Sequence, residues 1–248
     1  MSTLVTWLGH STVLAENGSL SILTDPVLSQ KVLWLRRHHP LPIRPEEIPQ
    51  PTAIFISHAH YDHLDIPSFK YFSSQVPIVL PKGLGRLVGK FVKNRLIELP
   101  TGVTVEIQEG LRVTTFPVTH FSFRLSGLTW RECCGYWIEM NGTKIFFPGD
   151  TAYRSDFSNL KGPDVALLPI GPIRPEWFMK KRHLTPEDAL RVAEEIEAKM
   201  TIPIHWGTFR LSPEPLNDPI DRFRRLVSER GWDNRVSILR PGENKEIS

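Results

Sequence analysis

The chain has 248 residues, of which 40% are apolar and 23% charged, and this balance excludes a disordered chain. Thirty Lys and Arg against 27 Asp and Glu leave a net charge of +3, so we expect no nucleic-acid partner. No stretch reaches the roughly 18 apolar residues of a membrane span, and no secretory signal is visible, so we expect a cytoplasmic protein. The two cysteines, Cys133 and Cys134, are adjacent, which predicts small buried strand residues rather than a disulfide.

The first half of the sequence predicts short strands, then an alternation of strand and helix. Asn17-Gly18 is a typical hairpin signal, and a Pro-rich connection over 27–51 is long enough to be functional or mobile. The expected strands cover 4–8, 11–15, 20–23, 53–56 and 78–80, and the expected helices cover 64–71 and 83–93.

The second half repeats this order. The expected strands cover 103–107, 111–115, 135–140, 144–147, 165–168 and 202–204, and the expected helices cover 186–199 and 220–230. Asn141-Gly142 marks a hairpin, and Thr185 is the expected N-cap of the helix that begins at Pro186. Two halves of similar length, with no linker between them, predict one domain over 1–248 in which two sheets pack face to face under outer helices.

One turn carries four potential metal ligands directly after the apolar run Ala53–Ile56. The side chains of His58 and His60 point to the same side of an extended segment, and the turn lets Asp62 and His63 face a neighbouring point. This one segment could therefore serve two ions. Imidazole and carboxylate suit Zn²⁺, with Fe or Mn as other occupants, and a site without thiolate favours hydrolysis over a closed structural role. The alternative is a polar surface turn.

Three later segments share one format, an apolar strand followed by a His or an Asp. They end at His120 (V-T-T-F-P-V-T-H), Asp150 (I-F-F-P-G-D) and His205 (I-P-I-H). Taken singly, they could be a capped strand end, an Asx turn after Gly149 and a partly buried histidine beside Trp206. Together with the earlier turn they supply seven N and O ligands, the number that two ions need if a carboxylate and a hydroxide bridge them.

The ordered motifs H-A-H-Y-D-H-L-D, F-F-P-G-D-T-A-Y and I-P-I-H-W-G-T-F resemble the signature of the metallo-β-lactamase superfamily. W-L-G-H-S-T-V-L, L-T-D-P and H-L-T-P-E-D-A are similar to its N-acylphosphatidylethanolamine-hydrolysing phospholipase D branch. The resemblance covers nearly the whole chain. It implies an α/β fold, the four-layer αββα sandwich, and two zinc ions: one on His58, His60 and His120, the other on Asp62, His63 and His205, with Asp150 bridging and His183 contacting substrate.

Two divalent ions would lower the pKa of a shared water from ~15.7 towards neutrality, so a metal-bridging hydroxide could attack without a Ser or Cys nucleophile. Asp62, Asp150 and His183 are the candidate catalytic residues. His183 could act as general acid or oxyanion donor, because an imidazole changes protonation near neutral pH. Helix capping is its alternative role.

A ligating histidine usually donates its other N–H to a carboxylate or a carbonyl. His10, Asp25 and Asp65 are the candidates for this orienting role or for contact with substrate. Turn formation at Asp25 and simple burial of His10 are equally compatible with the sequence.

Two stretches mix aromatic and basic residues, 31–44 with Trp34 and 174–182 with Trp177. Such loops suit a small-molecule or phospholipid-like anionic substrate and peripheral membrane contact. The same composition describes a homo-oligomer interface or a lid, which we favour over the membrane.

The predicted function is that of a dinuclear zinc phosphodiesterase, a metal-dependent hydrolase of the phospholipase D-like kind. A lactonase or carboxylic-ester hydrolase on the same ligands is the first alternative, because ligand set and fold do not fix the substrate. An iron-dependent redox enzyme is the second, since His and carboxylate sites also accept Fe.

Overall fold

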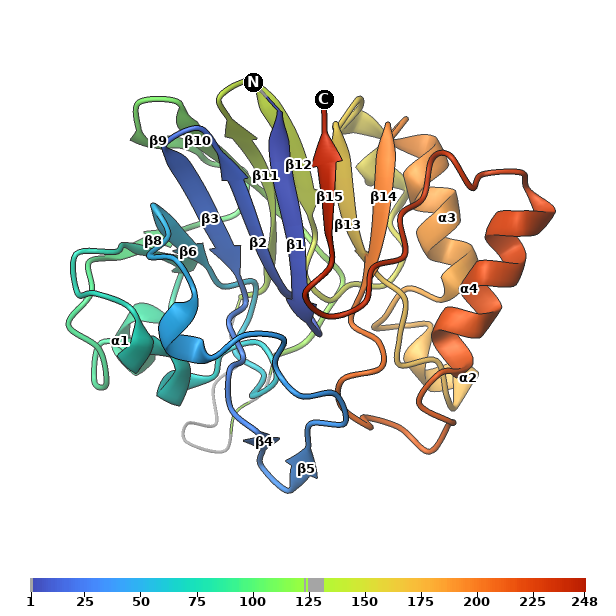
Figure 1. The fold of residues 1–248 in the computed structure, drawn as a ribbon, viewed down its shortest axis with the longest axis horizontal. Helices are drawn as coiled ribbons and strands as arrows, with labels where there is room; N and C mark the ends of the chain where they lie inside the picture. Colours follow the sequence, from blue (N-terminus) through green and yellow to red (C-terminus); the bar gives the residue numbers. More distant parts are fainter. Residues whose placement is uncertain (1, 123, 125–131) are drawn as a thin grey trace.

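The computed structural model describes residues 2–122, 124 and 132–248, and in it two β-sheets pack face to face (Figure 1). The first sheet has the spatial order β15 (Asn244–Ile247), β1 (Thr3–Gly9), β2 (Thr12–Asn17), β3 (Leu20–Thr24), β6 (Ala53–Phe55), β7 (Ile78–Pro81) and β8 (Leu96–Leu99). The second has the order β14 (Met200–Ile204), β13 (Val165–Pro169), β12 (Thr143–Phe147), β11 (Cys134–Met140), β10 (Leu111–Pro117) and β9 (Thr104–Gln108).

Helices cover the outer face of each sheet. α1 (Gly85–Val88) and a 3₁₀ turn at Ile66–Tyr71 pack on the first sheet, while α3 (Pro186–Glu195) and α4 (Asp218–Glu229) lie beside the second (Figure 1). The remaining elements are the hairpin of β4 (Lys31–Val32) and β5 (Leu35–Arg36), α2 (Glu176–Met179), and 3₁₀ turns at Pro45–Glu47 and Ser155–Asn159. The predicted αββα sandwich is therefore confirmed.

The period-2 pattern of the strands builds two apolar layers. In β6, Phe55 points into the interior between the sheets, whereas Ile54 joins the cluster under α1. Tyr136 of the second sheet meets Phe55 edge-on at 5.3 Å between ring centroids, and its hydroxyl donates to the carbonyl of Ile56 at 2.7 Å. The two sheets are thus joined directly at the point where β6 ends.

Strands of both sheets share one direction, and the carboxyl ends of these strands meet at one edge of the sandwich. β1 and β3 are both antiparallel to β2, and β6 is parallel to β3. In the second sheet, β10 and β12 are both antiparallel to β11, and β13 and β14 continue in the direction of β12. Figure 1 shows this edge at the bottom of the view, with β4, β5 and α2 beyond it. Side chains that follow these strands therefore collect at one place.

Several expected elements differ from the observed ones. The helix expected over 83–93 is only α1, because Gly85 and Gly89 bound it and glycine is a poor helix former. The helix expected over 64–71 is a 3₁₀ turn with a proline near its start. The edge strands β8 and β15 were not predicted; β15 is a short polar segment that pairs with β1. The N-cap at Thr185 is confirmed by its hydrogen bond from the Asp188 N–H.

Candidate metal centre

The first of two donor groups lies where β6, β10 and β12 end. His60 Nδ1 is 2.9 Å from His58 Nε2 and 3.1 Å from His120 Nε2, so three ring nitrogens converge. Asp150 Oδ2 lies 3.9 Å from His120 Nε2. One ligand atom from each of these four residues lies within 4.8 Å of all the others, so this group could hold a metal ion.

The second group adjoins the first. His205 Nε2, after β14, is 3.1 Å from His63 Nε2 and 3.6 Å from Asp62 Oδ2. Asp150 reaches this group as well, with Oδ2 at 3.4 Å from His63 Nε2 and Oδ1 at 3.2 Å from His205 Nε2. His10 is the further member, 3.0 Å from Asp62 Oδ2. The seven residues that the sequence singled out as ligands thus lie together, with Asp150 between the two groups.

The donor atoms fit a cation. His120 Nδ1 faces the Arg182 carbonyl at 3.0 Å, and a carbonyl only accepts, so the neutral ring carries its hydrogen on Nδ1 and directs the Nε2 lone pair at the cluster. Asp25 Oδ2 likewise lies 2.7 Å from His63 Nδ1, so that His63 also directs its Nε2 at the cluster. Neighbouring ligands of a tetrahedral zinc with Zn–N about 2.0–2.1 Å lie roughly 3.3 Å apart, close to the spacings here. Asp150 Oδ1 is buried, and its 3.2 Å contact with His205 Nε2 lacks the geometry of a hydrogen bond, so this oxygen has no hydrogen-bond partner among the described residues.

Burial and charge set the protonation of the cluster. Burial lowers the pKa of His58 well below its usual value and that of His60 to about 4, so both imidazoles are neutral near pH 7. Burial alone would raise the pKa of Asp150, but His205 and other histidines outweigh it and lower that pKa well below its ordinary value. Burial opposes charge on His205 too, yet Asp150 raises its pKa to about 9. Buried carboxylates therefore attract positive charge to this point.

Ser57, which the sequence analysis did not single out, ties the first sheet to the cluster. Asp25 accepts hydrogen bonds from the Ser57 N–H at 2.7 Å and from the Ser57 hydroxyl at 2.6 Å, in addition to the one from His63. The same hydroxyl lies 2.9 Å from His58 Nδ1. Burial raises the pKa of Asp25, against the lowering effect of His63. A serine between a buried strand and a ligand was the only available signal in the sequence.

His10 holds Asp62 from the other side. His10 is 1% exposed, and burial lowers its pKa to about 3. The backbone N–H of His10 donates to the Thr208 hydroxyl at 2.8 Å. His10, Asp25 and His205 all have left-handed backbone, with φ of 55°, 32° and 60°. Strained non-glycine residues of this kind cluster at functional sites, and here each follows the end of a strand.

One predicted residue, Asp65, does not take its expected place, and one residue that was not predicted, Arg124, supports the site. The structure does not bring Asp65 to an imidazole: Asp65 precedes the 3₁₀ turn at Ile66–Tyr71, and its Oδ2 accepts from the hydroxyls of Ser29 and Ser68 at 2.6 Å and 2.5 Å. Arg124, which no motif indicated, donates to the Leu64 carbonyl at 2.8 Å and stacks on Tyr61 at 4.0 Å. Arg124 thereby fixes the turn that carries four of the donors.

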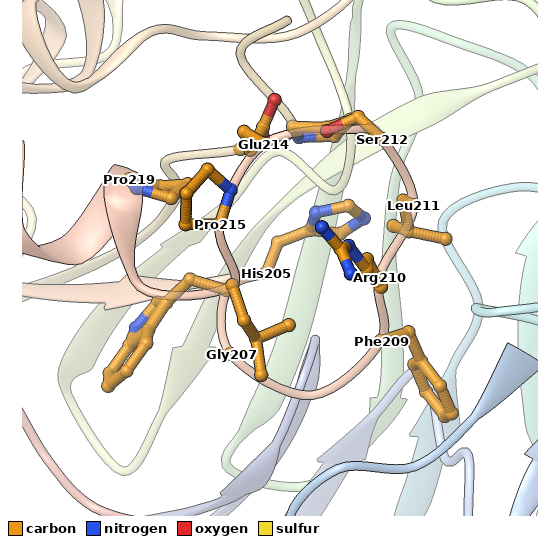
Figure 2. A pocket seen from close by; sticks show the side chains of 13 residues that line it. His205, Gly207, Phe209, Arg210, Leu211, Ser212, Glu214, Pro215 and Pro219 are labelled. Carbon is orange, nitrogen blue, oxygen red and sulfur yellow. The ribbon is translucent and has the colours of Figure 1, made fainter.

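Two hollows border the cluster. A pocket of about 510 Å³ is lined by His60, His120 and His183 and is the space in which a substrate could meet the donors. His183 Nδ1 lies 3.4 Å from Asp150 Oδ2, and burial lowers the pKa of His183 to about 3. A second cavity of about 20 Å³ adjoins His205, where the segment after β14 curls around that side chain (Figure 2).

The two aromatic-plus-basic stretches flank this edge of the sandwich (Figure 1). Trp34, between β4 and β5, is 78% exposed and Trp177, in α2, is 73% exposed, so neither contributes to the core. No helix among the described residues has both the length and the apolar character that crossing a membrane requires.

Comparison with known proteins assigns this fold and donor set to the metal-dependent hydrolases. The chain belongs to the β-lactamase superfamily: the Beta-lactamase superfamily domain matches residues 21–206. A UPF0173 metal-dependent hydrolase of Methanopyrus kandleri is 30% identical over 98% of this chain and 99% of its own length. The resemblance found in the sequence is thereby confirmed.

Two kinds of similarity refine this assignment. The N-acyl-phosphatidylethanolamine-hydrolyzing phospholipase D 1 of Caenorhabditis elegans is 32% identical over 91% of this chain and 70% of its own length. The mitochondrial yeast enzyme of that name is 33% identical, but this chain spans 53% of it. Among solved structures, a possible metal-dependent hydrolase from Veillonella parvula has a TM-score of 0.80 at 16% identity, covering 99% of each chain, which shows the shared fold.

Proposed function

We propose that this protein is a dinuclear zinc phosphodiesterase of the phospholipase D-like kind. The observation that carries the proposal is the position of Asp150, whose carboxylate lies within 3.4 Å of His63 and His205 and 3.9 Å of His120. A carboxylate between two groups of donors suits a pair of ions. The relatives named for hydrolysis of N-acyl-phosphatidylethanolamine support a phosphodiester as the bond that is cut.

The proposed ligands fall into the two groups described above. His58, His60 and His120 would hold one ion, Asp62, His63 and His205 the other, and Asp150 both. Bound there, the ions would supply Lewis-acid chemistry and draw the attacking nucleophile from water. Ser57, Asp25 and the Arg182 carbonyl hold the rings in the orientation that this requires.

The chain's own residues orient and polarise the substrate. His183 lines the pocket beside His120, and its largely buried ring offers an N–H to an oxygen of the phosphodiester. Of the two predicted roles of His183, general acid and oxyanion donor, this favours the oxyanion donor. A neutral imidazole can donate a hydrogen bond without losing its proton. His10 keeps Asp62 in place from outside the pocket.

The test is a substrate panel on protein whose metal content has been measured. We expect turnover of bis-p-nitrophenyl phosphate and of an N-acylated phosphatidylethanolamine, with two zinc ions per chain. Turnover of simple lactones or carboxylic esters alone would replace the phosphodiesterase by the lactonase or ester-hydrolase alternative. Iron in place of zinc, with consumption of oxygen, would identify the redox enzyme instead.

A further inference from the structure

Arg182 lies at the wall of the pocket that opens on the donors. Its backbone carbonyl accepts from His120, and the residue lines the 510 Å³ pocket together with Phe121 and Phe178. The guanidinium carbon lies 4.3 Å from the ring centroid of Phe178 and 5.4 Å from that of Phe121. Two aromatic rings of the pocket therefore hold the charged head group beside the donor cluster.

The side chain of Arg182 is half-buried at the pocket wall. Among the residues that the structure describes, no carboxylate lies within 4.0 Å of its guanidinium, whereas Arg154, Arg191 and Arg222 all have carboxylate partners. Stacking on rings occupies the flat faces of a guanidinium and leaves its N–H edge for oxygen atoms. A partly buried arginine with a free edge in a substrate pocket is suited to an anion.

We propose that Arg182 is the specificity-determining residue of this pocket and that its guanidinium binds a non-bridging oxygen of an anionic phosphodiester. The inference rests on the proposed function and adds the group that selects an anionic substrate over a neutral ester. The rings of Phe121 and Phe178 position the guanidinium before the substrate arrives, so less side-chain entropy is lost on binding.

The test is the variant R182Q, which keeps the backbone carbonyl that faces His120 and replaces the guanidinium by a shorter, neutral amide. For the zinc-loaded enzyme we expect the KM for bis-p-nitrophenyl phosphate to rise about 10- to 100-fold, the range for loss of a hydrogen bond to a charged group. The kcat should change much less, and zinc content and the KM for the neutral ester p-nitrophenyl acetate should stay as in the wild type. R191Q is the matched control, because Arg191 also stacks on a ring, at 3.9 Å from that of Tyr153, but lies outside the pocket.

Calorimetric binding of diphenyl phosphate, an anion that needs no turnover to be measured, separates this inference from the proposed function. If the wild type does not hydrolyse phosphodiesters, the proposed function fails. Even then, the role of Arg182 is supported if R182Q binds diphenyl phosphate more weakly than the wild type and R191Q do. Equal binding by R182Q and the wild type overturns that role. An unchanged KM for the diester, or an equal rise for p-nitrophenyl acetate, overturns it too.

Discussion

Asp150 is the residue on which the two donor groups depend, because it is the carboxylate in contact with both. Asp150→Asn keeps the shape of the side chain but removes the charge that attracts cations to this buried point. We expect the variant to lose at least one of two zinc ions and to hydrolyse bis-p-nitrophenyl phosphate about 10³-fold more slowly. Metal analysis by mass spectrometry and initial rates measure the two effects.

The matched control is Asp156→Asn. Asp156 forms an ion pair with Arg154 at the surface and lies outside the cluster, so metal content and rate should not change. Full zinc content together with wild-type turnover in the Asp150 variant would contradict the proposed ligand set.

The two cysteines provide a prediction about reactivity. Burial raises the pKa of Cys133 and of Cys134 to about 12. The thiolate is the reactive form, so at pH 8 the reactive fraction is roughly 10³-fold smaller than for a thiol with the ordinary pKa of 9.0. We expect iodoacetamide to label neither residue in the folded protein within minutes and both in guanidinium chloride, as intact mass will show. Rapid labelling of the folded protein would mean that the thiols are not protected by burial.

Part of the site was visible in the sequence because its donors are chemically distinctive and follow apolar strands. His58, His120 and Asp150 could be named from this pattern. Ser57 and the Arg182 carbonyl could not, since a serine hydroxyl and a backbone oxygen have no distinctive spacing. Their roles come from contacts between segments that only the folded chain brings together.

At the scale of elements, the loop after β12 must pass very close to the loop after β6. Gly149 has φ of +59°, and a Cβ there would lie 2.4 Å from Ser57 Cβ. Gly149→Ala therefore forces Ser57 away from Asp25, and we expect a loss of about 3 kcal/mol in the free energy of unfolding. Urea denaturation measures the loss, and zinc affinity should fall with it.

Gly231→Ala is the control for backbone conformation alone. Gly231 has nearly the same φ, +63°, but an added Cβ meets no atom within 4 Å. This substitution should cost only about 1 kcal/mol and leave zinc affinity unchanged. Equal losses for the two variants would show that the contact with Ser57 does not matter.

The strands were predicted better than the helices. Buried strands such as β6 and β13 are continuous apolar runs, whereas α1 has a glycine at each end and the segment before β7 forms a 3₁₀ turn. The polar edge strand β15 was invisible, because its pairing with β1 joins opposite ends of the chain. Such pairing depends on tertiary contacts and not on local propensity.

At the scale of the whole molecule, cations that bind the folded state alone should stabilise it. With free zinc at about 100 times its dissociation constant, linkage contributes about 2.7 kcal/mol, which corresponds to a Tm roughly 5–10 °C higher for a chain of this size. We expect EDTA to lower the Tm by that amount and added zinc to restore it, as differential scanning fluorimetry will show.

EDTA already saturated with zinc is the control and should leave the Tm where it was. An identical Tm before and after complete removal of metal would mean that the cluster binds no cation in the folded state.

The hydroxyl of Tyr136 donates across the interior of the sandwich to the carbonyl of Ile56, two residues before His58. Since His120, Asp150 and His205 are anchored in one sheet and the 58–63 turn in the other, the spacing of the ligands depends on how the sheets are aligned. Substitutions at the contact between the two sheets, such as at Tyr136, should therefore alter which cation fits best without changing any ligand. Libraries designed to change metal preference should include such deep positions as well as the pocket wall.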